Sequence, residues 1–425
     1  MPGPDAAPAV AEVAPPAAQR APRRRLSPMA AFAGTSATFA ALFFAAGAPT
    51  PLLVQYQHEW DFPAGLLTVA FAVYTLALLA ALLVGGSLSD HVGRRPVLIG
   101  SLLTEAVAMA VFIVAPGIGW IICARVIQGA ATGMATSAFT ASVVELAPAG
   151  RERLGSVIAG TSAAGGLGLG ALVTGAAIQL TDAANTITFA ALSVIMVAGA
   201  AVAALSRETA PLRPGAARSL LPRVKVPPAA RREFTAAVPV LLAAWMLGGL
   251  FMGLAPIIVL DIFHVHGGFA GGATASIYPL AGSTAGFALG RLPARGAMVV
   301  GSAAVLVAAA LIVGAVGIRE LPLFLVGGVV GGAGFGGSFS GAIRLVSPLA
   351  EQHQRASLFA GAYVVAYLAF GVPVLIAGQL ISPLGLLPTV IGYGAVILAC
   401  ATAGLTAQRL APATAGKSLR GRRTS

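Results

Sequence analysis

Four charged or titratable residues gather in one short segment of a chain that otherwise avoids charge. The segment Gly85 to Gly100 reads GGSLSDHVGRRPVLIG and contains Asp90, His91, Arg94 and Arg95, whereas only 9% of the 425 residues are charged. An arginine side chain binds a carboxylate through two parallel hydrogen bonds, and an aspartate accepts hydrogen bonds from the N-terminus of a helix. These residues could therefore join this segment to neighbouring helices.

Two more ionisable residues, Glu105 and Arg125, lie inside runs long enough to be membrane helices. Burying an arginine at the centre of a membrane helix costs about 2.5–3.5 kcal/mol, so Arg125 should face a polar cavity or a partner, or bond backbone carbonyls between helices. At about 1.5 Å of rise per residue, the vertical gap between the two side chains is about 7 Å. Glu105 is then a proton-binding carboxylate, the partner of Arg125, or a hydrogen-bonded structural group.

The composition is that of a membrane protein. Hydrophobic residues make up 57% of the chain, and apolar runs of about 18 residues or more, long enough to cross a hydrocarbon layer as a helix, recur along almost its whole length. The alternation typical of the strands of a membrane barrel is not seen. We predict an all-α membrane protein with twelve transmembrane helices, over residues 29–56, 66–86, 97–115, 118–144, 154–180, 186–205, 235–260, 267–289, 297–317, 321–346, 356–381 and 384–407.

The placement of charge predicts the orientation in the membrane. The formal net charge is +12, but a nucleic-acid-binding domain would collect its basic residues on one water-exposed face, among aromatic residues. Here the basic residues fall in the two tails and in every second loop, whereas the alternate loops hold Glu59, Asp61, Asp182 and Asp261. By the positive-inside rule both termini are cytoplasmic, which requires an even number of spans. We expect contact with the lipid bilayer and none with nucleic acid.

A polar segment rich in Pro and Arg divides the spans into two sets of six. Arg153 and Arg355 open apolar helices at equivalent places in the two sets, which indicates a weak internal repeat. This organisation favours a transporter with its substrate site between two repeats, near the midplane. The predicted parts are a disordered cytoplasmic tail (1–28), an N-terminal six-helix bundle (29–205), a cytoplasmic linker (206–234), a C-terminal six-helix bundle (235–407) and a basic cytoplasmic tail (408–425).

The segment between spans two and three carries an ordered motif. It fits G-x-L-x-D-x-x-G-R-[KR] through Gly86, Asp90, Gly93, Arg94 and Arg95. We expect Gly86 to let two helices approach closely and Gly93 to permit the tight reversal of a short loop. The motif strongly resembles the loop signature of the major facilitator superfamily, and the resemblance extends over the full twelve-span length.

The resemblance implies the fold of that superfamily, two six-helix bundles that work by alternating access, and a gate on the cytoplasmic side. In the family, the equivalent of Asp90 latches the loop onto the start of span eleven, which lies here near Arg355. The arginine, here Arg94, pairs with an acid at the end of span four, here Glu145. This latch keeps the cytoplasmic side closed while the transporter faces outward. We expect the membrane to be a bacterial inner membrane.

A second element of the same family lies in span four. Arg125, Gln128 and Gly129, in ARVIQG, match its R-x-x-Q-G element. In proton-coupled members of the family this arginine is implicated in coupling. The resemblance therefore places Arg125, Gln128 and Gly129 among the candidates for proton coupling. Glu105 joins them through its position inside a predicted span.

A third element, GLGLGALVTG in span five, resembles an antiporter-associated glycine pattern. Gly166, Gly170 and Gly175 match it, but Ala171 replaces its proline and Thr174 a glycine. Small residues at this spacing also serve close helix packing. We expect proton-coupled export by antiport, with an importer or uniporter of a small metabolite as the alternative.

No enzyme site, metal site or cofactor is predicted. GAGFGG at 332–337 fits a dinucleotide-binding motif but lies inside an apolar span with no strand before it. Cys123 and Cys400 lie in spans, which excludes a paired-cysteine metal site, and His264 and His266 belong to an outer loop. An intramembrane enzyme would need clustered acids within the spans, and a membrane sensor would need a folded signalling domain.

Aromatic and polar side chains within the spans are candidates for the substrate cavity. Few fixed charges accompany them, which suits an apolar or weakly polar small molecule, whereas packing or contact with lipid is the alternative role for each. We expect a monomer that binds one small-molecule substrate and protons. The candidates are Tyr74, Gln128, Trp245, Tyr278, Tyr363 and Tyr367.

Overall fold

The computed structural model describes residues 25–210, 214–222, 224–289, 291–351 and 354–410. Throughout these residues the secondary structure is helical, with no strand, so the predicted all-α fold is confirmed. Most of the two predicted tails, 1–28 and 408–425, lies outside the described residues.

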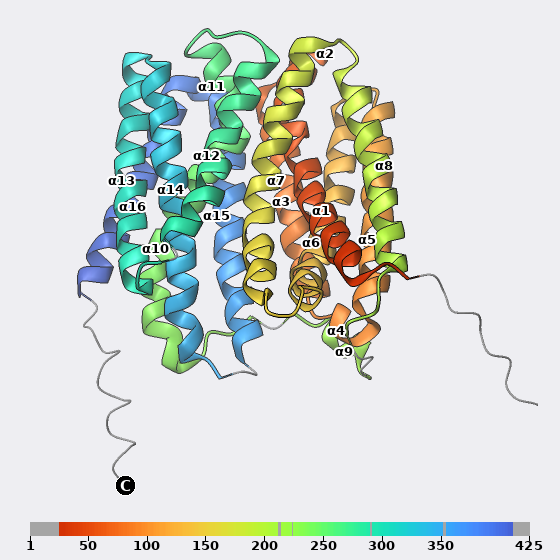
Figure 1. The fold of residues 1–425 in the computed structure, drawn as a ribbon. Helices are drawn as coiled ribbons and strands as arrows, with labels where there is room; N and C mark the ends of the chain where they lie inside the picture. Colours follow the sequence, from red (N-terminus) through yellow and green to blue (C-terminus); the bar gives the residue numbers. More distant parts are fainter. Residues whose placement is uncertain (1–24, 211–213, 223, 290, 352–353, 411–425) are drawn as a thin grey trace, which may run out of the picture.

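The first half of the chain forms one bundle, drawn from red to yellow in Figure 1. The first predicted span is divided into two helices at Ala48, where Pro49 begins the second. Pro49 has no backbone N–H to donate, and proline is tolerated at the first position of a helix. The helices are α1 (Pro28–Gly47), α2 (Pro49–Trp60), α3 (Ala64–Gly85), the short α4 (Ser89–Val92), α5 (Arg94–Val114), α6 (Ile118–Glu145), α7 (Glu152–Leu180) and α8 (Ala184–Leu205).

The second half forms the other bundle, drawn from green to blue in Figure 1. Its first helix begins at Arg231, so the chain between the bundles is residues 206–230, which we call the linker. The elements are α9 (Ala216–Ser219) and η1 (Pro228–Ala230) in the linker, then α10 (Arg231–Gly249), the π-helical turn η2 (Leu250–Leu254), α11 (Ala255–Asp261), α12 (Gly268–Leu289), α13 (Ala294–Ile318), α14 (Leu321–Val346), η3 (Ser347–Leu349), α15 (Arg355–Leu384) and α16 (Leu386–Leu410).

Eleven helical segments among the described residues are long and apolar enough to cross a membrane. They correspond to the predicted spans except at α12, which has 22 residues but is rich in Gly, Ser and Thr and falls outside that set. A helix of this composition is suited to burial against other helices rather than against lipid, because small residues allow close backbone approach.

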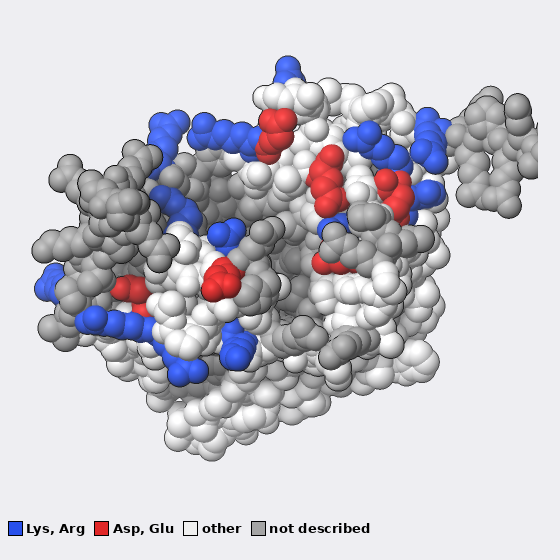
Figure 2. All heavy atoms as spheres, turned by 90° about the horizontal axis from the view of Figure 1, so that it is seen from below, with Lys and Arg blue, Asp and Glu red and all other residues white. Residues whose placement is uncertain are grey.

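The two bundles stand side by side, and both ends of the described chain lie at the same face of the molecule (Figure 1). This face also carries α4 and α9, and we call it the basic face. Seen from that side, Lys and Arg side chains lie over both bundles, with acidic side chains among them (Figure 2). Each bundle has a large apolar core, since one buried cluster centres on Phe39, Phe112 and Phe139 and another on Phe251 and Phe324. The second cluster also includes Phe71 of α3 and Ala171 of α7, so it extends across the interface.

The bundles meet along helix pairs that pack closely. Gly175 of α7 lies against Gly272 of α12, where an added Cβ at Gly175 would fall 2.8 Å from the Cα of Gly272. On the other side of the interface, an added Cβ at Gly371 of α15 would lie 3.2 Å from the side chain of Thr75 on α3. Small side chains therefore set the separation between the bundles.

Candidate functional site

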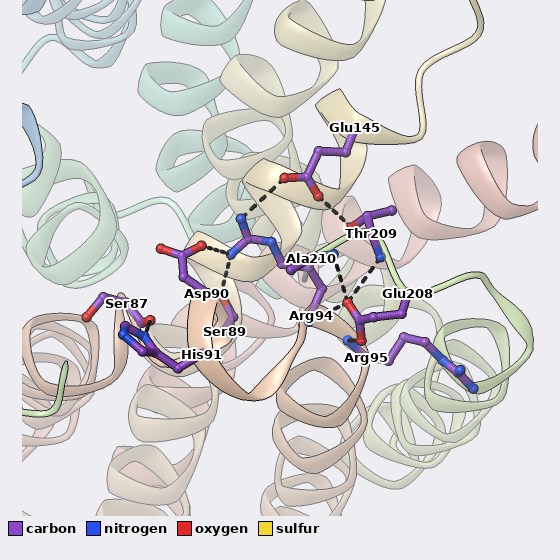
Figure 3. Close-up of polar contacts among 10 residues, drawn as sticks. All are labelled: Ser87, Ser89, Asp90, His91, Arg94, Arg95, Glu145, Glu208, Thr209 and Ala210. Atoms are coloured by element: carbon purple, nitrogen blue, oxygen red, sulfur yellow. Dashed lines mark hydrogen bonds and ion pairs between the residues drawn. The ribbon is translucent and has the colours of Figure 1, made fainter. Parts of the chain in front are cut away.

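The charged segment between α3 and α5 forms a connected polar cluster on the basic face (Figure 3). Nη1 of Arg94 lies 2.5 Å from Oδ1 of Asp90 and donates to Oγ of Ser89 at 2.6 Å. Nη2 of Arg94 lies 3.3 Å from Oε1 of Glu145, at the end of α6. The Arg94 side chain is largely covered, at 13% exposure, against 47% for Asp90. Arg94 thus joins α4 to the end of α6.

Glu208 of the linker holds the start of α5. Its carboxylate accepts hydrogen bonds from the backbone N–H groups of Arg94, at 2.8 Å, and Arg95, at 3.1 Å. The residue before α5 is Gly93, which has no side chain to cap the helix and adopts φ 99°. A Cβ at Gly93 would lie 2.6 Å from Oε2 of Glu208, so glycine is required both by the backbone angle and by the space.

Of two expectations for this segment, one differs from the structure. The other, the contact of Asp90 with the start of α15, is expected for a closed basic face and stays a prediction. Gly86 makes no close approach to another helix, because the nearest atoms to an added Cβ belong to Leu82 in its own chain turn. Asp90 pairs with Arg94, and no ion pair between Asp90 and Arg355 is seen among the described residues. Nε of Arg355 instead donates to the carbonyl of Ala350 at 3.4 Å.

Asp90 and the N-terminus of α15 face a common cavity of about 670 Å³ on the basic face. Asp90 and Gly86 line one side of the cavity, and Ala356, Ser357 and Tyr363 line the other. The two bundles are therefore separated here, with the polar cluster of α4 on one wall and the start of α15 on the other. Figure 2 views this side of the molecule.

Towards the opposite face the bundles are in contact. Phe71 of α3 packs against Phe370 of α15 with ring centroids 5.2 Å apart. Beyond this pair, Nε2 of Gln379 on α15 donates to the carbonyl of Gly65 on α3 at 3.1 Å. The cavity at this end is only about 240 Å³. The interface between the bundles is thus more open at the basic face than at the opposite one.

A polar network is buried inside the first bundle. Nη1 of Arg125 donates to Oε1 of Gln128 at 2.6 Å, and Nε2 of Gln128 donates to Oε1 of Glu105 at 3.1 Å. All three side chains are buried. Arg125 also donates to the carbonyls of Ala46 and Ala70, at 3.1 and 3.2 Å. An arginine here is tolerated because its donors are met by oxygen atoms of three helices.

The network differs from the direct pair that the sequence left open. Within the described residues no ion pair joins Glu105 to Arg125, and Gln128 lies between them. The guanidinium carbon of Arg125 stacks 4.1 Å from the ring centre of Tyr74. Oε2 of Glu105 and the hydroxyl of Tyr74 make no hydrogen bond of good geometry among the described residues, although the hydroxyl of Thr132 lies near both. Both groups are buried. The Glu105 oxygen can accept a hydrogen bond, and the Tyr74 hydroxyl can donate one.

Gly129 serves packing beside this network. A Cβ at Gly129 would fall against the carbonyl oxygen of Tyr74 on α3. The glycine thus lets α6 and α3 approach at the level where Arg125 crosses between them.

Aromatic side chains of the second bundle cluster around Trp245. Its ring lies 5.2 Å from that of Tyr367 and 5.9 Å from that of Phe370, and Tyr363 is 6.0 Å from Tyr367. Tyr367 also packs against the cluster that contains Tyr74, so the aromatic group reaches the first bundle. Nε1 of Trp245 is buried without a hydrogen-bond partner among the described residues.

Unlike Nε1 of Trp245, the hydroxyl of Tyr278 already has a hydrogen-bond partner. Its hydroxyl donates to the carbonyl of Ala244 at 2.5 Å, and its ring stacks on Phe251. The side chain is therefore fixed as a packing element of the second bundle.

The three glycines of α7 lie at helix contacts. Added Cβ atoms at Gly166 and Gly170 would meet the backbone carbonyls of Ala40 and Phe44 on α1, and Gly175 meets α12. This arrangement accounts for all three by packing. The described residues contain no cluster of three or more His, Cys, Asp or Glu that would bind a metal ion.

Three polar residues of the site were not anticipated from the sequence: Ser89, Glu208 and Thr209. The hydroxyl of Thr209 donates to Oε2 of Glu145 at 2.5 Å, beside the contact of Arg94 with the other oxygen. The available signal was an acid and a threonine shortly after the last residue of a span, in a linker otherwise rich in Pro and Arg.

Comparisons with known proteins agree with this architecture. Residues 35–319 match the family described as Major Facilitator Superfamily. None of the curated proteins compared with the chain matches it.

Solved structures share the fold at low sequence identity. A POT family transporter in complex with 5-aminolevulinic acid superposes with a TM-score of 0.70 at 15% identity, over 90% of this chain and 96% of that one. A bacterial homologue of the human lysosomal transporter Spinster, in an inward-facing and unoccupied conformation, gives a TM-score of 0.71 at 13% identity, over 90% and 97%. A peptide transporter POT in complex with sulfate gives 0.70 at 12%, over 89% and 93%.

Proposed function

The chain belongs to the Major Facilitator Superfamily, and from that premise we propose that it is a secondary active transporter that exports a small molecule in exchange for protons. The observation that carries the proposal is the asymmetry of the interface between the bundles. A cavity of about 670 Å³ opens on the basic face, whereas deeper in the interface Phe71 packs against Phe370 and the cavity at the opposite end is about 240 Å³. An interface more open at one end than at the other is the arrangement that alternating access requires.

The polar cluster of Asp90, Arg94 and Glu145 is the gate in this proposal. With the cavity open, Asp90 pairs with Arg94 on its own side. Closure of the basic face would carry Asp90 across the cavity to the N-terminus of α15, at Arg355 and Ser357, where backbone N–H groups and the helix dipole favour a carboxylate. Arg95, the last residue of the loop motif, keeps α5 attached to α8 through the carbonyl of Ala203.

The buried network of Glu105, Gln128 and Arg125 is the proposed site of proton coupling. Support comes from the unpartnered Oε2 of Glu105, since a buried carboxyl oxygen without a hydrogen bond is a site where a proton can be gained or released. Gln128 connects that carboxyl to Arg125, and Arg125 stacks on Tyr74, which packs beside Tyr367 of the second bundle. A proton on Glu105 would thus alter contacts that reach the interface.

The substrate proposed for this cavity is apolar or weakly polar. Tyr363 lines the open cavity, and Tyr367, Trp245 and Tyr74 continue inward from it. Trp245 Nε1 and the Tyr74 hydroxyl are hydrogen-bond donors that make no hydrogen bond of good geometry among the described residues, so they would donate to acceptors of a substrate. Tyr278 is left out, because its hydroxyl is already bonded to Ala244.

We further propose that the protein is a monomer in a bacterial inner membrane, with the basic face in the cytoplasm. Support for the orientation comes from the charge distribution, since Lys and Arg side chains lie on the face that holds both ends of the described chain. A similar protein of known structure is described as inward-facing, which agrees with a cavity that opens to the cytoplasm.

Purified protein in liposomes with an imposed pH gradient tests the proposal. We expect one or more compounds of a mixed library to evoke proton movement, and to move in the direction opposite to the protons. Movement of compound and protons in the same direction would favour the alternative, an importer. Transport that ignores the gradient would favour a uniporter and would refute antiport.

A further inference from the structure

The linker makes contacts with the gate that the loop motif alone does not explain. Glu208 accepts four backbone hydrogen bonds: from Arg94 at 2.8 Å and from Arg95, Thr209 and Ala210 at 3.1 Å (Figure 3). Two of these donors belong to the first turn of α5, and two belong to the linker itself. A single half-buried carboxylate therefore fixes the linker and the start of α5 in one geometry.

The same junction is tied in the reverse direction by Arg95. Its guanidinium donates to the carbonyl of Ala203 at 3.2 Å and also to the carbonyl of Ala204, both in the last turn of α8. An acid after α8 thus binds the N–H groups of α5, and a base in α5 binds the carbonyls of α8. Each charge lies at the helix end whose dipole favours it.

The linker also touches the partners of Arg94. The hydroxyl of Thr209 donates to Oε2 of Glu145, and Nη2 of Arg94 donates to Oε1 of the same side chain. Glu145 is therefore held between the gate arginine and the linker, so its position depends on both.

Farther along, the linker reaches both walls of the open cavity. Oγ of Ser87, just before α4, donates to the carbonyl of Ser219 in α9 at 3.0 Å. The backbone N–H of Lys225 lies 3.4 Å from the carbonyl of Ser357 at the start of α15. The linker accordingly runs from the gate cluster of the first bundle to the helix start that the gate would meet.

We propose that Glu208 is a positioning residue of the gate, which orients Arg94 by fixing the backbone from which its side chain extends. With Glu208 in place, Arg94 holds Asp90 ready to meet α15 when the basic face closes. Without it, the first turn of α5 loses two acceptors, and the alignment of Arg94 with Asp90 and Glu145 is lost. This inference rests on the proposed function, because it assumes that the basic face closes in a transport cycle.

The experiment measures how Glu208→Ala shifts the balance between open and closed basic faces. Spin labels are attached to cysteines introduced at Arg153 and Leu349, two exposed positions on the basic face in different bundles. Pulsed electron paramagnetic resonance in liposomes then measures the distance between the two labels. The native cysteines, Cys123 and Cys400, are replaced by alanine. We expect the E208A variant to raise the ratio of open to closed molecules about fivefold, the scale of a lost helix cap.

Three companion variants separate positioning from general damage. Glu233→Ala removes a partly exposed acid of α10, next to the linker, and should leave the ratio unchanged. Glu208→Gln keeps one acceptor oxygen, so its ratio of open to closed molecules should lie between those of the wild type and E208A. If Glu208 acts through the Arg94 side chain, then E208A should not change the ratio of open to closed molecules further in an Arg94→Ala background. A merely structural role would instead lower stability equally in both backgrounds.

The outcomes distinguish the two claims. Two populations in the wild type with an unchanged ratio in E208A would overturn the role of Glu208 alone, as would an equal shift in E233A or a full effect of E208A without the Arg94 side chain. A single fixed distance in the wild type would overturn both the role of Glu208 and the proposed function.

Discussion

Glu105, Gln128 and Arg125 show how a membrane-spanning bundle accommodates two charged residue types without a direct ion pair. The sequence indicated that Arg125 needs a polar partner, but it could not say which, because several faces of α6 were possible. The structure places Gln128 between the two, one helical turn from Arg125. The i, i+3 spacing in ARVIQG puts these side chains on one face of the helix, so the match to the span-four element carried more information than the separate residues did.

At the level of single residues, we predict that Glu105→Gln abolishes proton-driven transport. Glutamine has nearly the same shape and keeps an oxygen that can accept from Nε2 of Gln128, but it cannot bind and release a proton. Transport driven by a pH gradient should fall to the rate without a gradient, measured in liposomes. Glu59→Gln, on an exposed residue of the opposite face, is the control. An unchanged response to pH in E105Q would remove Glu105 from coupling.

A second prediction concerns Arg125→Lys. A lysine keeps the charge but loses the planar fork, so the carbonyls of Ala46 and Ala70 and Oε1 of Gln128 cannot all be bonded. Each unsatisfied buried group costs about 1–3 kcal/mol, and the apparent melting temperature in detergent should drop clearly. Arg151→Lys, at an exposed position, should leave the melting temperature unchanged. Equal melting temperatures for both variants would contradict the described network.

At the level of helices, the sequence predicted nearly every membrane-spanning helix, because runs of apolar residues long enough to cross a bilayer are a strong and local signal. The short elements α4, α9, η1 and η3 were not predicted. The exceptions among the spans have local causes. Pro49 divides the first span, and the π-helical turn η2 interrupts the seventh within a continuous apolar run. The cap of α5 by Glu208 could not be predicted, because it joins residues 114 positions apart through a loop with no periodicity.

The glycines of α7 provide a test of helix packing. A Cβ at Gly170 would collide with the carbonyl oxygen of Phe44 on α1, whereas a Cβ at Gly160, in the same helix, meets nothing within 4 Å. Gly170→Ala should therefore destabilise the first bundle by about 1–3 kcal/mol, the usual cost of overpacking. Gly160→Ala should be neutral or slightly stabilising. Thermal unfolding of both variants measures the difference, and similar melting temperatures would contradict the close contact between α7 and α1.

At the level of the whole molecule, Asp90 links the gate to the transport cycle. We expect Asp90→Asn to reduce transport about tenfold, since a loss of about 1.4 kcal/mol in the closed state changes an equilibrium by that factor. The variant should still fold and insert into the membrane, because Asp90 is half exposed and its partner Arg94 retains Ser89 and Glu145. Asp182→Asn on the opposite face is the control, and transport at the wild-type rate by D90N would refute the gate.

Alternating access makes the strongest demand on the molecule as a whole, because the two faces must open in turn. The most direct test places spin-label pairs at Arg153 and Leu349 on the basic face, and at Asp182 and Arg319 on the opposite face. Distances are measured in liposomes at pH 5 and pH 8. We predict two populations at each face, with the open fraction rising at one face as it falls at the other. One fixed distance at both faces, or changes in the same direction at both, would contradict transport by alternating access.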